Sequence, residues 1–150
     1  MNPVVVRAAA LADVDRVVSM YEWLFAPPGA RPPRWDAERA ATALAHAVGS
    51  DGAVVLVAML GDEFVGFCTG YDDIVSVRFG RRVWVEDLAV HPERRSLGIG
   101  KRLLDEAKHW ARARGASHLE LDSAETRAAA HRFYEREQPS WRSICFGWEL

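Results

Sequence analysis

The chain has 150 residues, 49% of them hydrophobic, and a formal net charge of -2. A chain of this size builds one compact domain with a sizeable core, so we expect residues 1–150 to form a single domain. The nearly balanced charge gives no reason to expect a nucleic-acid partner, and the longest apolar stretch, Ala53–Leu60, is far shorter than the roughly 20 residues that span a bilayer. With no membrane partner and no secretory signal pattern at the start, we expect a cytoplasmic protein.

The first predicted elements are a strand, two helices and the loop that joins the helices. Val4–Ala8 is typical of a strand, and apolar residues over Val14–Leu24 recur at the spacing of one helical face. Prolines and a glycine over residues 26–33 exclude regular structure there. Asp36 is a suitable N-cap for a second helix over Ala37–Val48.

A hairpin, a strand and a helix follow. Ala53–Leu60 and Phe64–Tyr71 are rich in β-forming residues and are joined by a short turn, which predicts a β-hairpin. A polar connection over Asp72–Arg81 leads to a strand over Arg82–Val90. A long amphipathic helix then begins near Gly98.

The last predicted elements are a strand over His118–Asp122, a helix capped by Ser123 that runs to about Arg136, and a strand over Trp141–Trp148. In this order, hairpins are mixed with crossover helices. The sequence therefore predicts an α/β or α+β fold, with a mixed sheet and helices on both of its faces.

The turn into the helix near Gly98 has the composition of an anion-binding site. Gly98 and Gly100 remove side chains where a backbone approaches a ligand, and the first N–H groups of a helix have no partner within it. The pattern favours a phosphate or pyrophosphate group, with a glycine turn among solvated basic residues as the alternative. The basic residues around the turn are Arg94, Arg95, Lys101 and Arg102.

Two other phosphate-binding motifs are excluded at this turn. A Walker A loop requires a glycine where the chain has Arg95, and Ser or Thr where it has Arg102. A dinucleotide-binding fingerprint requires a further glycine where the chain has Leu103, and no glycine-rich turn follows the first strand.

Two segments around the turn resemble one enzyme family. The run Val85–Lys101, with Arg95-x-x-Gly98-x-Gly100 at its centre, resembles the acetyl-CoA signature of the GCN5-related N-acetyltransferase (GNAT) family. Ala130–Arg136 resembles the late helix that carries a tyrosine near the coenzyme sulfur in this family. The resemblance implies a GNAT-like fold with a mostly antiparallel sheet, acetyl-CoA as co-substrate, and acetyl transfer to a primary amine of a small molecule.

The resemblance also implies roles for individual residues. The backbone of Leu88–Val90 would pair with the pantetheine arm, and the N–H groups over Leu97–Lys101 would hold the pyrophosphate. The chain departs from the family at Arg127, where Asn is frequent, and at Gln138-Pro139, where Gly-Phe is usual. The implied coenzyme-binding residues are Leu88, Ala89, Val90, Arg95, Ser96, Leu97, Gly98, Ile99, Gly100, Lys101 and Arg102.

Acetyl transfer to an amine needs a group that removes a proton from the nucleophile. An alkylamine with a pKa near 10 is only about one part in a thousand neutral at pH 7, and a nearby carboxylate both takes the proton and attracts the cation. Glu86 and Asp87 are adjacent on one predicted strand, so at most one should reach the cleft. We favour Glu86 as the base because it shares a face with Leu88. Ion pairs with Arg81 or Arg82 are the alternative role of both carboxylates.

Asp122 and Tyr134 complete the candidate catalytic residues. Asp122 ends a predicted strand, and its spacing to Tyr134 resembles that of the acid in some family members, so it is a second candidate base. Helix capping beside Ser123 is its alternative role. The resemblance implies that Tyr134 protonates the departing thiolate, with packing beside Phe133 in the core as the alternative.

Other expectations concern specificity, metals, cysteines and assembly. Substrate choice is expected to depend on the loop flanked by Phe25 and Trp35 and on the connection over Asp72–Arg81. No Cys or His pair has the spacing of metal ligands, so we predict no metal. The alternative functions are a peptide or protein N-acetyltransferase and a non-catalytic acyl-CoA-binding sensor.

Two further predictions come from the strand-like runs. Cys68 and Cys145 both lie in such runs and are predicted to be buried free thiols. The apolar segment Ile144–Leu150 leads us to expect a homodimer.

Overall fold

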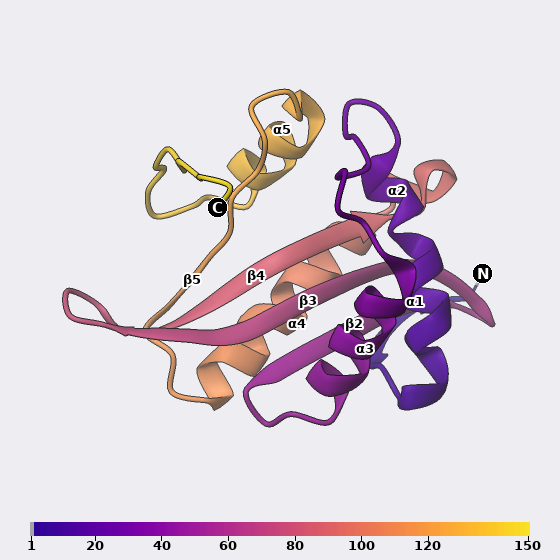
Figure 1. Ribbon diagram of the computed structural model, residues 1–150, viewed down its shortest axis with the longest axis horizontal. Helices are drawn as coiled ribbons and strands as arrows, with labels where there is room; N and C mark the ends of the chain where they lie inside the picture. Colours follow the sequence, from indigo (N-terminus) through magenta and orange to yellow (C-terminus); the bar gives the residue numbers. More distant parts are fainter. Residues whose placement is uncertain (1) are drawn as a thin grey trace.

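The computed structural model describes residues 2–150 and has one sheet flanked by helices (Figure 1). The strands within these residues lie side by side in the order β1 (Val4–Ala8), β2 (Ala53–Leu60), β3 (Glu63–Ser76), β4 (Gly80–Val90) and β5 (His118–Glu120). The strands from β1 to β4 are antiparallel to their neighbours, whereas β5 is parallel to β4. The predicted fold class, with a mixed and mostly antiparallel sheet, is confirmed.

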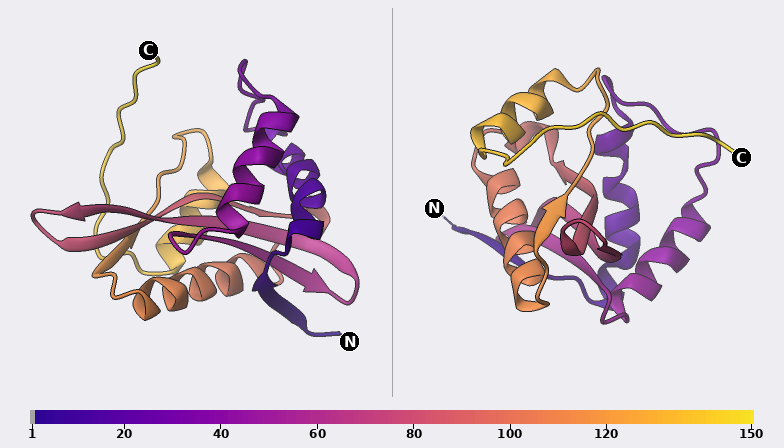
Figure 2. Two further views of the ribbon diagram at one scale, coloured as in Figure 1. Left: turned by 60° about the horizontal axis from the view of Figure 1, so that its bottom comes forward. Right: turned by 90° about the vertical axis from the view of Figure 1, so that its left-hand side faces the viewer.

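Helices cover both faces of the sheet, as predicted. They are α1 (Val14–Met20), α2 (Glu22–Phe25), α3 (Ala37–Val48), α4 (Ile99–Ala113) and α5 (Ala128–Arg136), with short 3-10 turns at Leu11–Asp13 and Pro92–Arg94. The helices α1 and α3 pack on one face and α4 on the other (Figures 1 and 2). Asp36 caps α3 as predicted, because its carboxylate accepts the Arg39 N–H at 3.0 Å.

Two apolar clusters hold these layers together. On one face, Val17 of α1 and Leu44 of α3 pack with Phe67 of the sheet. On the other face, Ile99 and Leu103 of α4 are buried against β2, β3 and β4. Because burying one large apolar side chain contributes about 1.5 to 3 kcal/mol, the first turn of α4 is fixed firmly to the sheet.

The predicted helix over Val14–Leu24 forms two short helices. The Tyr21 N–H bonds to the Val18 carbonyl at 3.2 Å, three residues earlier, which is the tighter turn of a 3-10 helix. This turn separates α1 from α2 and leaves Tyr21 at their junction. From there the Tyr21 hydroxyl reaches Asp87 of β4.

The chain between β3 and β4 is not the polar connection that the sequence predicts. β3 continues to Ser76 and β4 begins at Gly80, so most of Asp72–Arg81 forms the end of a long hairpin. The charged side chains there have partners. Asp72, for example, accepts a hydrogen bond from Arg114 Nε at 2.9 Å. Because such charges are paired, a polar sequence continues as strand beyond the apolar core.

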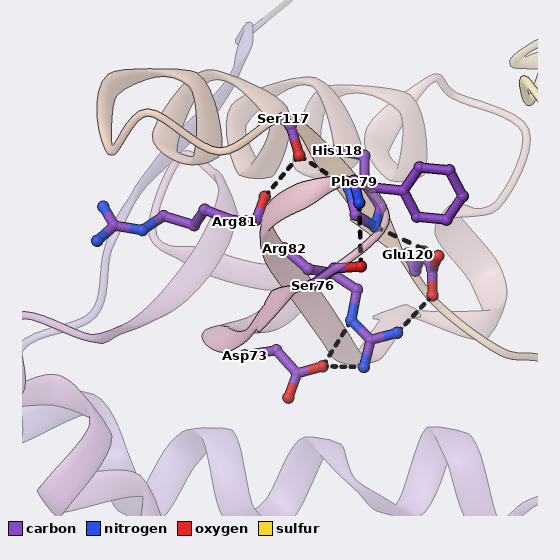
Figure 3. A network of polar contacts seen from close by, with 8 residues as sticks. All are labelled: Asp73, Ser76, Phe79, Arg81, Arg82, Ser117, His118 and Glu120. Atoms are coloured by element: carbon purple, nitrogen blue, oxygen red, sulfur yellow. Dashed lines mark hydrogen bonds and ion pairs between the residues drawn. The ribbon is translucent and has the colours of Figure 1, made fainter.

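Polar contacts of Arg82 and Ser117 connect β4 with β3 and with the start of β5 (Figure 3). Arg82 donates from Nε to Asp73 at 2.7 Å and from Nη1 to Glu120 at 2.9 Å. The Ser117 hydroxyl donates to a β4 carbonyl at 2.9 Å. Only three residues of β4 and three of β5 are paired with each other, and these two strands then separate. Among the described residues, the β4 edge over residues 85–90 therefore has no strand partner on the β5 side.

The chain after β5 departs most from the prediction. α5 begins at Ala128 and not beside Ser123, whose hydroxyl makes no capping hydrogen bond. The predicted strand over Trp141–Trp148 is not formed, because a strand needs a paired neighbour and residues 141–150 have no backbone hydrogen bond to other described residues. The segment begins against the body of the molecule, where Trp141 stacks on Phe79 with ring centroids 5.6 Å apart, and its end projects outward in the left view of Figure 2. Its alternate apolar side chains are between 73% and 107% exposed: Ile144, Phe146, Trp148 and Leu150.

The two cysteines have different environments. Cys68 is a buried free thiol, as predicted, but Cys145 is free and exposed, so the prediction of burial is wrong there. The reason is that the strand expected to bury Cys145 does not form. Of the helices within residues 2–150, none combines the length and apolar character needed to cross a bilayer.

Candidate active site

A cleft of about 420 Å³ lies where β4 and β5 separate. Its walls come from β4, the chain after β5, α2 with the loop that follows it, and α5. It is lined by Tyr21, Leu24, Phe25, Ala30, Pro32, Trp35, Val85, Glu86, Asp87, Leu88, Leu121, Asp122, Ser123, Ala124, Arg127, Ala130 and Tyr134. All three predicted catalytic residues, Tyr134, Glu86 and Asp122, are among them.

A β-bulge in β4 brings both neighbouring carboxylates into this cleft. Thr69 of β3 pairs with Asp87, and the next β3 residue pairs with Val85, so Glu86 has no partner across the β3 edge. On either side of the bulge, Val85 and Leu88 both pack toward α4. The prediction that only one of Glu86 and Asp87 reaches the cleft, and that Glu86 shares a face with Leu88, is therefore wrong. The extra residue resets the alternation of faces.

Asp87 is the more enclosed of the two carboxylates. Its Oδ2 accepts a hydrogen bond from the Tyr21 hydroxyl at 2.7 Å, and its backbone N–H donates to the buried Thr69 hydroxyl at 3.1 Å. Burial raises the pKa of Asp87, the Tyr21 hydrogen bond and the charge of Arg127 lower it, and Asp122 raises it. The net direction is upward because burial is the largest cause.

Glu86 and Asp122 lie nearer to solvent. Both side chains are exposed. The pKa of Glu86 is raised, first by partial desolvation and then by the charge of Asp87, while Tyr71 lowers it. Asp122 lies beside the Cys145 thiol, and a hydrogen bond to Asp122 raises the pKa of that thiol. Neither Glu86 nor Asp87 forms the predicted alternative ion pairs within residues 2–150, because Arg82 is paired elsewhere.

Tyr134 lies in the cleft wall, and the pKa of its hydroxyl is raised. This pKa is raised to about 12, mainly by burial and also by the neighbouring Cys68, Asp87 and Asp122, against the charge of Arg127. The hydroxyl is therefore protonated at neutral pH. The ring also packs at 5.0 Å from Phe133, so the structural role and a chemical role coexist.

The long helix α4 begins directly after Gly98, as predicted. Gly98 is the N-cap of α4 and has a φ of 78°, a left-handed conformation that favours glycine, while nothing lies within 4 Å of the place where its Cβ would be. Gly100 is different. A Cβ there would lie 3.4 Å from the Phe133 ring, so Gly100 lets α5 pack against the start of α4. Ser96 also has a positive φ, of 64°.

Most of the basic residues around the turn already have partners. Arg94 pairs with Glu63, Lys101 with Asp105 at 2.9 Å and Glu137 at 3.3 Å, and Arg102 donates to the Val4 carbonyl. Arg95 is exposed and makes no side-chain hydrogen bond or ion pair with residues 2–150. Of the four, Arg95 is therefore the one whose charge is most available to a ligand.

The remaining predicted coenzyme residues offer mainly their backbone. Leu88, Ala89 and Val90 lie on the part of β4 that has no partner on the β5 side. Ile99 is buried in the α4 cluster, so only its backbone is available, whereas Leu97 is exposed. The family resemblance predicted a backbone role for these residues, and their positions are compatible with it.

An aromatic wall adjoins Asp87 in the cleft. Tyr21 stacks on Trp35 with ring centroids 5.3 Å apart, and Phe25 meets Trp35 edge-on at 4.7 Å. The loop flanked by Phe25 and Trp35 lines the cleft, in line with its expected part in substrate choice. The segment Asp72–Arg81 does not contribute to the lining.

The site fits the coenzyme that the resemblance implies. The Ser123 hydroxyl is buried in the cleft wall without a hydrogen-bond partner among residues 2–150, which leaves a polar group for a ligand. The unpaired edge of β4 suits an extended chain with amide groups, and the left-handed turn before α4 suits a phosphate. In the described part of the chain, no three His, Cys, Asp or Glu side chains are grouped so as to hold a metal ion.

Two cleft residues have roles that sequence reasoning did not anticipate. Tyr21 belongs to the apolar helical face predicted over Val14–Leu24, and its hydrogen bond to Asp87 depends on contact of β4 with the junction of α1 and α2. Arg127 was noted only as a departure from the family, yet it lines the cleft and contacts α2. The replacement of a usual Asn by a long cation was the available signal for Arg127.

Comparisons with known proteins identify the family of the chain. The model of the acetyltransferase (GNAT) family matches residues 17–138. An uncharacterized N-acetyltransferase of Bacillus subtilis (strain 168), YhdJ, is 45% identical over 60 residues, which are 40% of this chain and 42% of that protein. A streptothricin acetyltransferase of Streptomyces lavendulae is 35% identical over 71 residues, 47% of this chain and 38% of that protein. The chain thus spans less than half the length of these two curated relatives.

A solved structure extends the comparison to the whole fold. The aminoglycoside N-acetyltransferase AAC(6')-Iy in complex with CoA has a TM-score of 0.85 at 13% sequence identity, covering 100% of this chain and 96% of that chain. At this identity the likeness shows the fold alone. The family match, in contrast, includes the bulged strand, the glycine turn and α5. The predicted family and enzyme class are confirmed: the chain belongs to the GNAT family of acetyltransferases.

Proposed function

We propose that this chain is an N-acetyltransferase that moves the acetyl group of acetyl-CoA to a primary amine of a small molecule. The observation that carries the proposal is the cleft, where Glu86 and Asp87 of β4 share the walls with Tyr134 of α5. Carboxylates beside a protonated hydroxyl are what amine acylation requires. The streptothricin and aminoglycoside acetyltransferases to which the chain is similar support a small-molecule acceptor.

The coenzyme would lie along β4 and over the glycine turn. Leu88–Val90 offer backbone groups, the N–H groups over Leu97–Lys101 offer an anion site, and Arg95 adds an unpaired guanidinium. Bound there, acetyl-CoA supplies an acetyl group activated as a thioester.

Glu86 is proposed as the base that takes a proton from the acceptor amine. Its side chain is exposed, whereas the Oδ2 of Asp87 already accepts the Tyr21 hydroxyl. The raised pKa of Glu86 makes its carboxylate a stronger base than an ordinary glutamate. The scarcity of neutral amine at pH 7 corresponds to about 4 kcal/mol, and this is the deficit that the carboxylate reduces.

Tyr134 is proposed to stabilise the departing sulfur with a hydrogen bond from its hydroxyl. Its pKa of about 12 keeps the proton on oxygen at neutral pH. Complete transfer of that proton to a thiolate would be uphill, since the corresponding thiol has a pKa of about 8.5. Hydrogen-bond donation during bond breaking therefore describes the role of Tyr134 better than full protonation.

The chemistry of the cleft favours a cationic acceptor. Among residues 2–150, three carboxylates and one cation, Arg127, line the cleft, so its charge attracts an ammonium ion. The aromatic wall of Tyr21, Phe25 and Trp35 adds faces that bind apolar groups and cations.

The release of free thiol from acetyl-CoA tests this function. The purified chain is incubated with acetyl-CoA alone, with a polyamine, with an aminoglycoside, and with a short peptide that has a free N-terminus. We expect a cationic small amine to accelerate release, and Glu86→Gln to abolish the acceleration. Release that no amine accelerates would support a coenzyme sensor, and acceleration by the peptide alone would support a protein N-acetyltransferase.

We also propose that the chain works as one domain, in the cytoplasm, and as a homodimer, with no nucleic-acid or membrane partner. Two unpaired thiols suit a reducing compartment, and the exposed apolar segment Ile144–Leu150 offers a surface for a second copy. Light scattering should give twice the mass of 16.7 kDa, and Trp148→Ser should lower it. A monomer at high concentration would contradict the dimer.

A further inference from the structure

Arg127 connects two parts of the cleft that are far apart in the sequence. It is the N-cap residue of α5, and its Nη2 donates to the Leu24 carbonyl at 2.9 Å, across a separation of 103 residues. Leu24 lies in the short helix α2, whose last carbonyls have no partner within the helix. A guanidinium there satisfies such a carbonyl and neutralises the negative end of the helix.

The loop after α2 passes directly over this hydrogen bond. A Cβ at Gly29 would lie 1.9 Å from the Leu24 carbonyl oxygen and 2.6 Å from Arg127 Nη2. The Gly29 N–H is itself bonded to the Ala26 carbonyl at 2.9 Å, which folds the loop back on α2. Only a residue without a side chain fits between these groups. The loop, α2 and α5 therefore meet at one point, and Arg127 is the side chain that joins them.

Arg127 also affects the charged groups of the cleft. Among the described residues that line it, Arg127 is the single cation beside three carboxylates. Its charge lowers the pKa of Asp87 and opposes the upward shift of the pKa of Tyr134. A change at Arg127 would therefore alter both the shape of the acceptor wall and the protonation of Asp87.

We propose that Arg127 is a positioning residue that holds the acceptor loop, residues 26–36, against α5 and so sets the distance between the aromatic wall and Tyr134. Through this contact it acts on the binding of the acceptor and leaves the coenzyme site unchanged. The kinetic part of the inference rests on the proposed function. The loop anchoring does not, because it is visible without catalysis.

Two substitutions separate anchoring from charge. Arg127→Met keeps much of the length but removes the hydrogen bond and the charge, and Arg127→Lys keeps the charge with a single ammonium group. Arg132→Met is the matched control, since Arg132 is an exposed residue of the same helix that makes no side-chain hydrogen bond or ion pair with residues 2–150. Gly29→Ala disturbs the same contact from the loop side and leaves Arg127 intact.

The first readout is tryptic cleavage of the folded protein at the Arg34–Trp35 bond within the loop. Loss of the anchor should accelerate this cleavage about tenfold in Arg127→Met and in Gly29→Ala, because a charged hydrogen bond no longer opposes loop opening. Arg132→Met should match the parent. If Arg127→Met is too unstable to assay, Gly29→Ala decides the outcome. Cleavage at the parental rate in the anchor variants would overturn the proposal, whether or not the protein acetylates amines.

The second readout is kinetic. In Arg127→Met the KM of the acceptor should rise about tenfold, while the Kd of acetyl-CoA stays at the parental value. Arg127→Lys, which keeps the charge but not the guanidinium, should recover only part of the lost acceptor affinity. Equal losses of acetyl-CoA and acceptor affinity would contradict the positioning role.

Discussion

The two sides of the cleft are held in place by different forces. On the coenzyme side, the glycine turn leads directly into α4, and Ile99 and Leu103 anchor that helix in the apolar core. On the acceptor side, Tyr21 and Leu24 also pack against the apolar core, but the links to Asp87 and to α5 are hydrogen bonds, from Tyr21 to Asp87 and from Arg127 to Leu24. Apolar burial is strong and insensitive to pH, whereas paired polar groups depend on charge and geometry.

This difference indicates on which side of the cleft amino-acid substitutions are tolerated. Because the apolar core fixes the start of α4, the backbone of the glycine turn has a single conformation. Such a rigid site suits a ligand that is always the same, as the coenzyme is. An acceptor wall held by individual hydrogen bonds can be altered by single substitutions without loss of the fold. Variants of the two sides should therefore differ in which ligand they affect.

The largest effect is expected at Glu86. Glu86→Gln should lower kcat/KM for the amine by about 100-fold to 10,000-fold, the range of a lost general base, and leave the Kd of acetyl-CoA unchanged. In the parent, the pKa of Glu86 is raised, so the acidic limb of kcat/KM should lie above the range of an ordinary glutamate. Steady-state rates across pH measure both. If Asp87→Asn removes activity and Glu86→Gln does not, the base is Asp87.

Tyr134 lies where the two sides meet. Tyr134→Phe should lower kcat about tenfold to a thousandfold, because the leaving thiolate loses a hydrogen bond. The loss is limited because a thiolate is an acceptable leaving group even without that hydrogen bond. The aromatic packing on Phe133 is retained, so melting temperature and coenzyme affinity should not change. Rates at saturating concentrations of both substrates test this. Unaltered turnover would remove Tyr134 from the mechanism.

A coenzyme-side variant should affect the other ligand. Gly100→Leu introduces a side chain whose Cβ lies 3.4 Å from the Phe133 ring, at the start of α4. We expect the affinity for acetyl-CoA to fall about a hundredfold, because the larger side chain pushes the first turn of α4 away from Phe133 and so displaces the N–H groups that would bind the pyrophosphate. Titration calorimetry measures it, with Gly147→Ala as control because nothing lies within 4 Å of that position. A Kd equal to that of the parent would show that the turn does not bind the coenzyme.

The smallest effect concerns stability on the acceptor side. Because the pKa of Asp87 is raised in the folded state, its ionised form costs stability, and that cost appears as pH rises through the unfolded and then the folded pKa. Asp87→Asn should raise the melting temperature by a few degrees at neutral pH. At a pH below the pKa of Asp87 in the unfolded chain, the substitution should not change the melting temperature. The side-chain oxygen of the introduced asparagine can still accept the hydrogen bond from the Tyr21 hydroxyl. Calorimetric scans at both pH values check this. A lower melting temperature at neutral pH would contradict the sign.

The sequence predicted structural features that depend only on residues close together in the chain. The start of the long helix near Gly98 and the cap of α3 by Asp36 were both predicted, because each depends on near neighbours. The position of Glu86 in the cleft was predicted because Glu86 was expected to share a strand face with Leu88. That reason is wrong, since Glu86 lies at a bulge that depends on the register between β3 and β4. Register is a property of two strands, so the alternation within one of them could not reveal it.

The failures have a common physical origin in long-range contacts. Trp141–Trp148 alternates like a strand, but no neighbouring strand within residues 2–150 pairs with it. Ser123 has the chemistry of a cap, but its hydroxyl lines the cleft and α5 begins later, at Ala128. Arg127 was recognised as unusual, but its partner Leu24 is 103 residues away. Local patterns identify what a residue can do, and the tertiary fold decides which partner it meets.

The melting temperature with and without saturating acetyl-CoA tests the central claim most directly. A ligand at a hundred times its Kd adds about 2.7 kcal/mol, which for a chain of this size corresponds to a rise of roughly 5 to 10 °C. The account predicts this rise for the parent and for Glu86→Gln, and a much smaller one for Gly100→Leu. No rise in the parent would contradict the coenzyme site, and an equal rise in Gly100→Leu would contradict its location at the glycine turn.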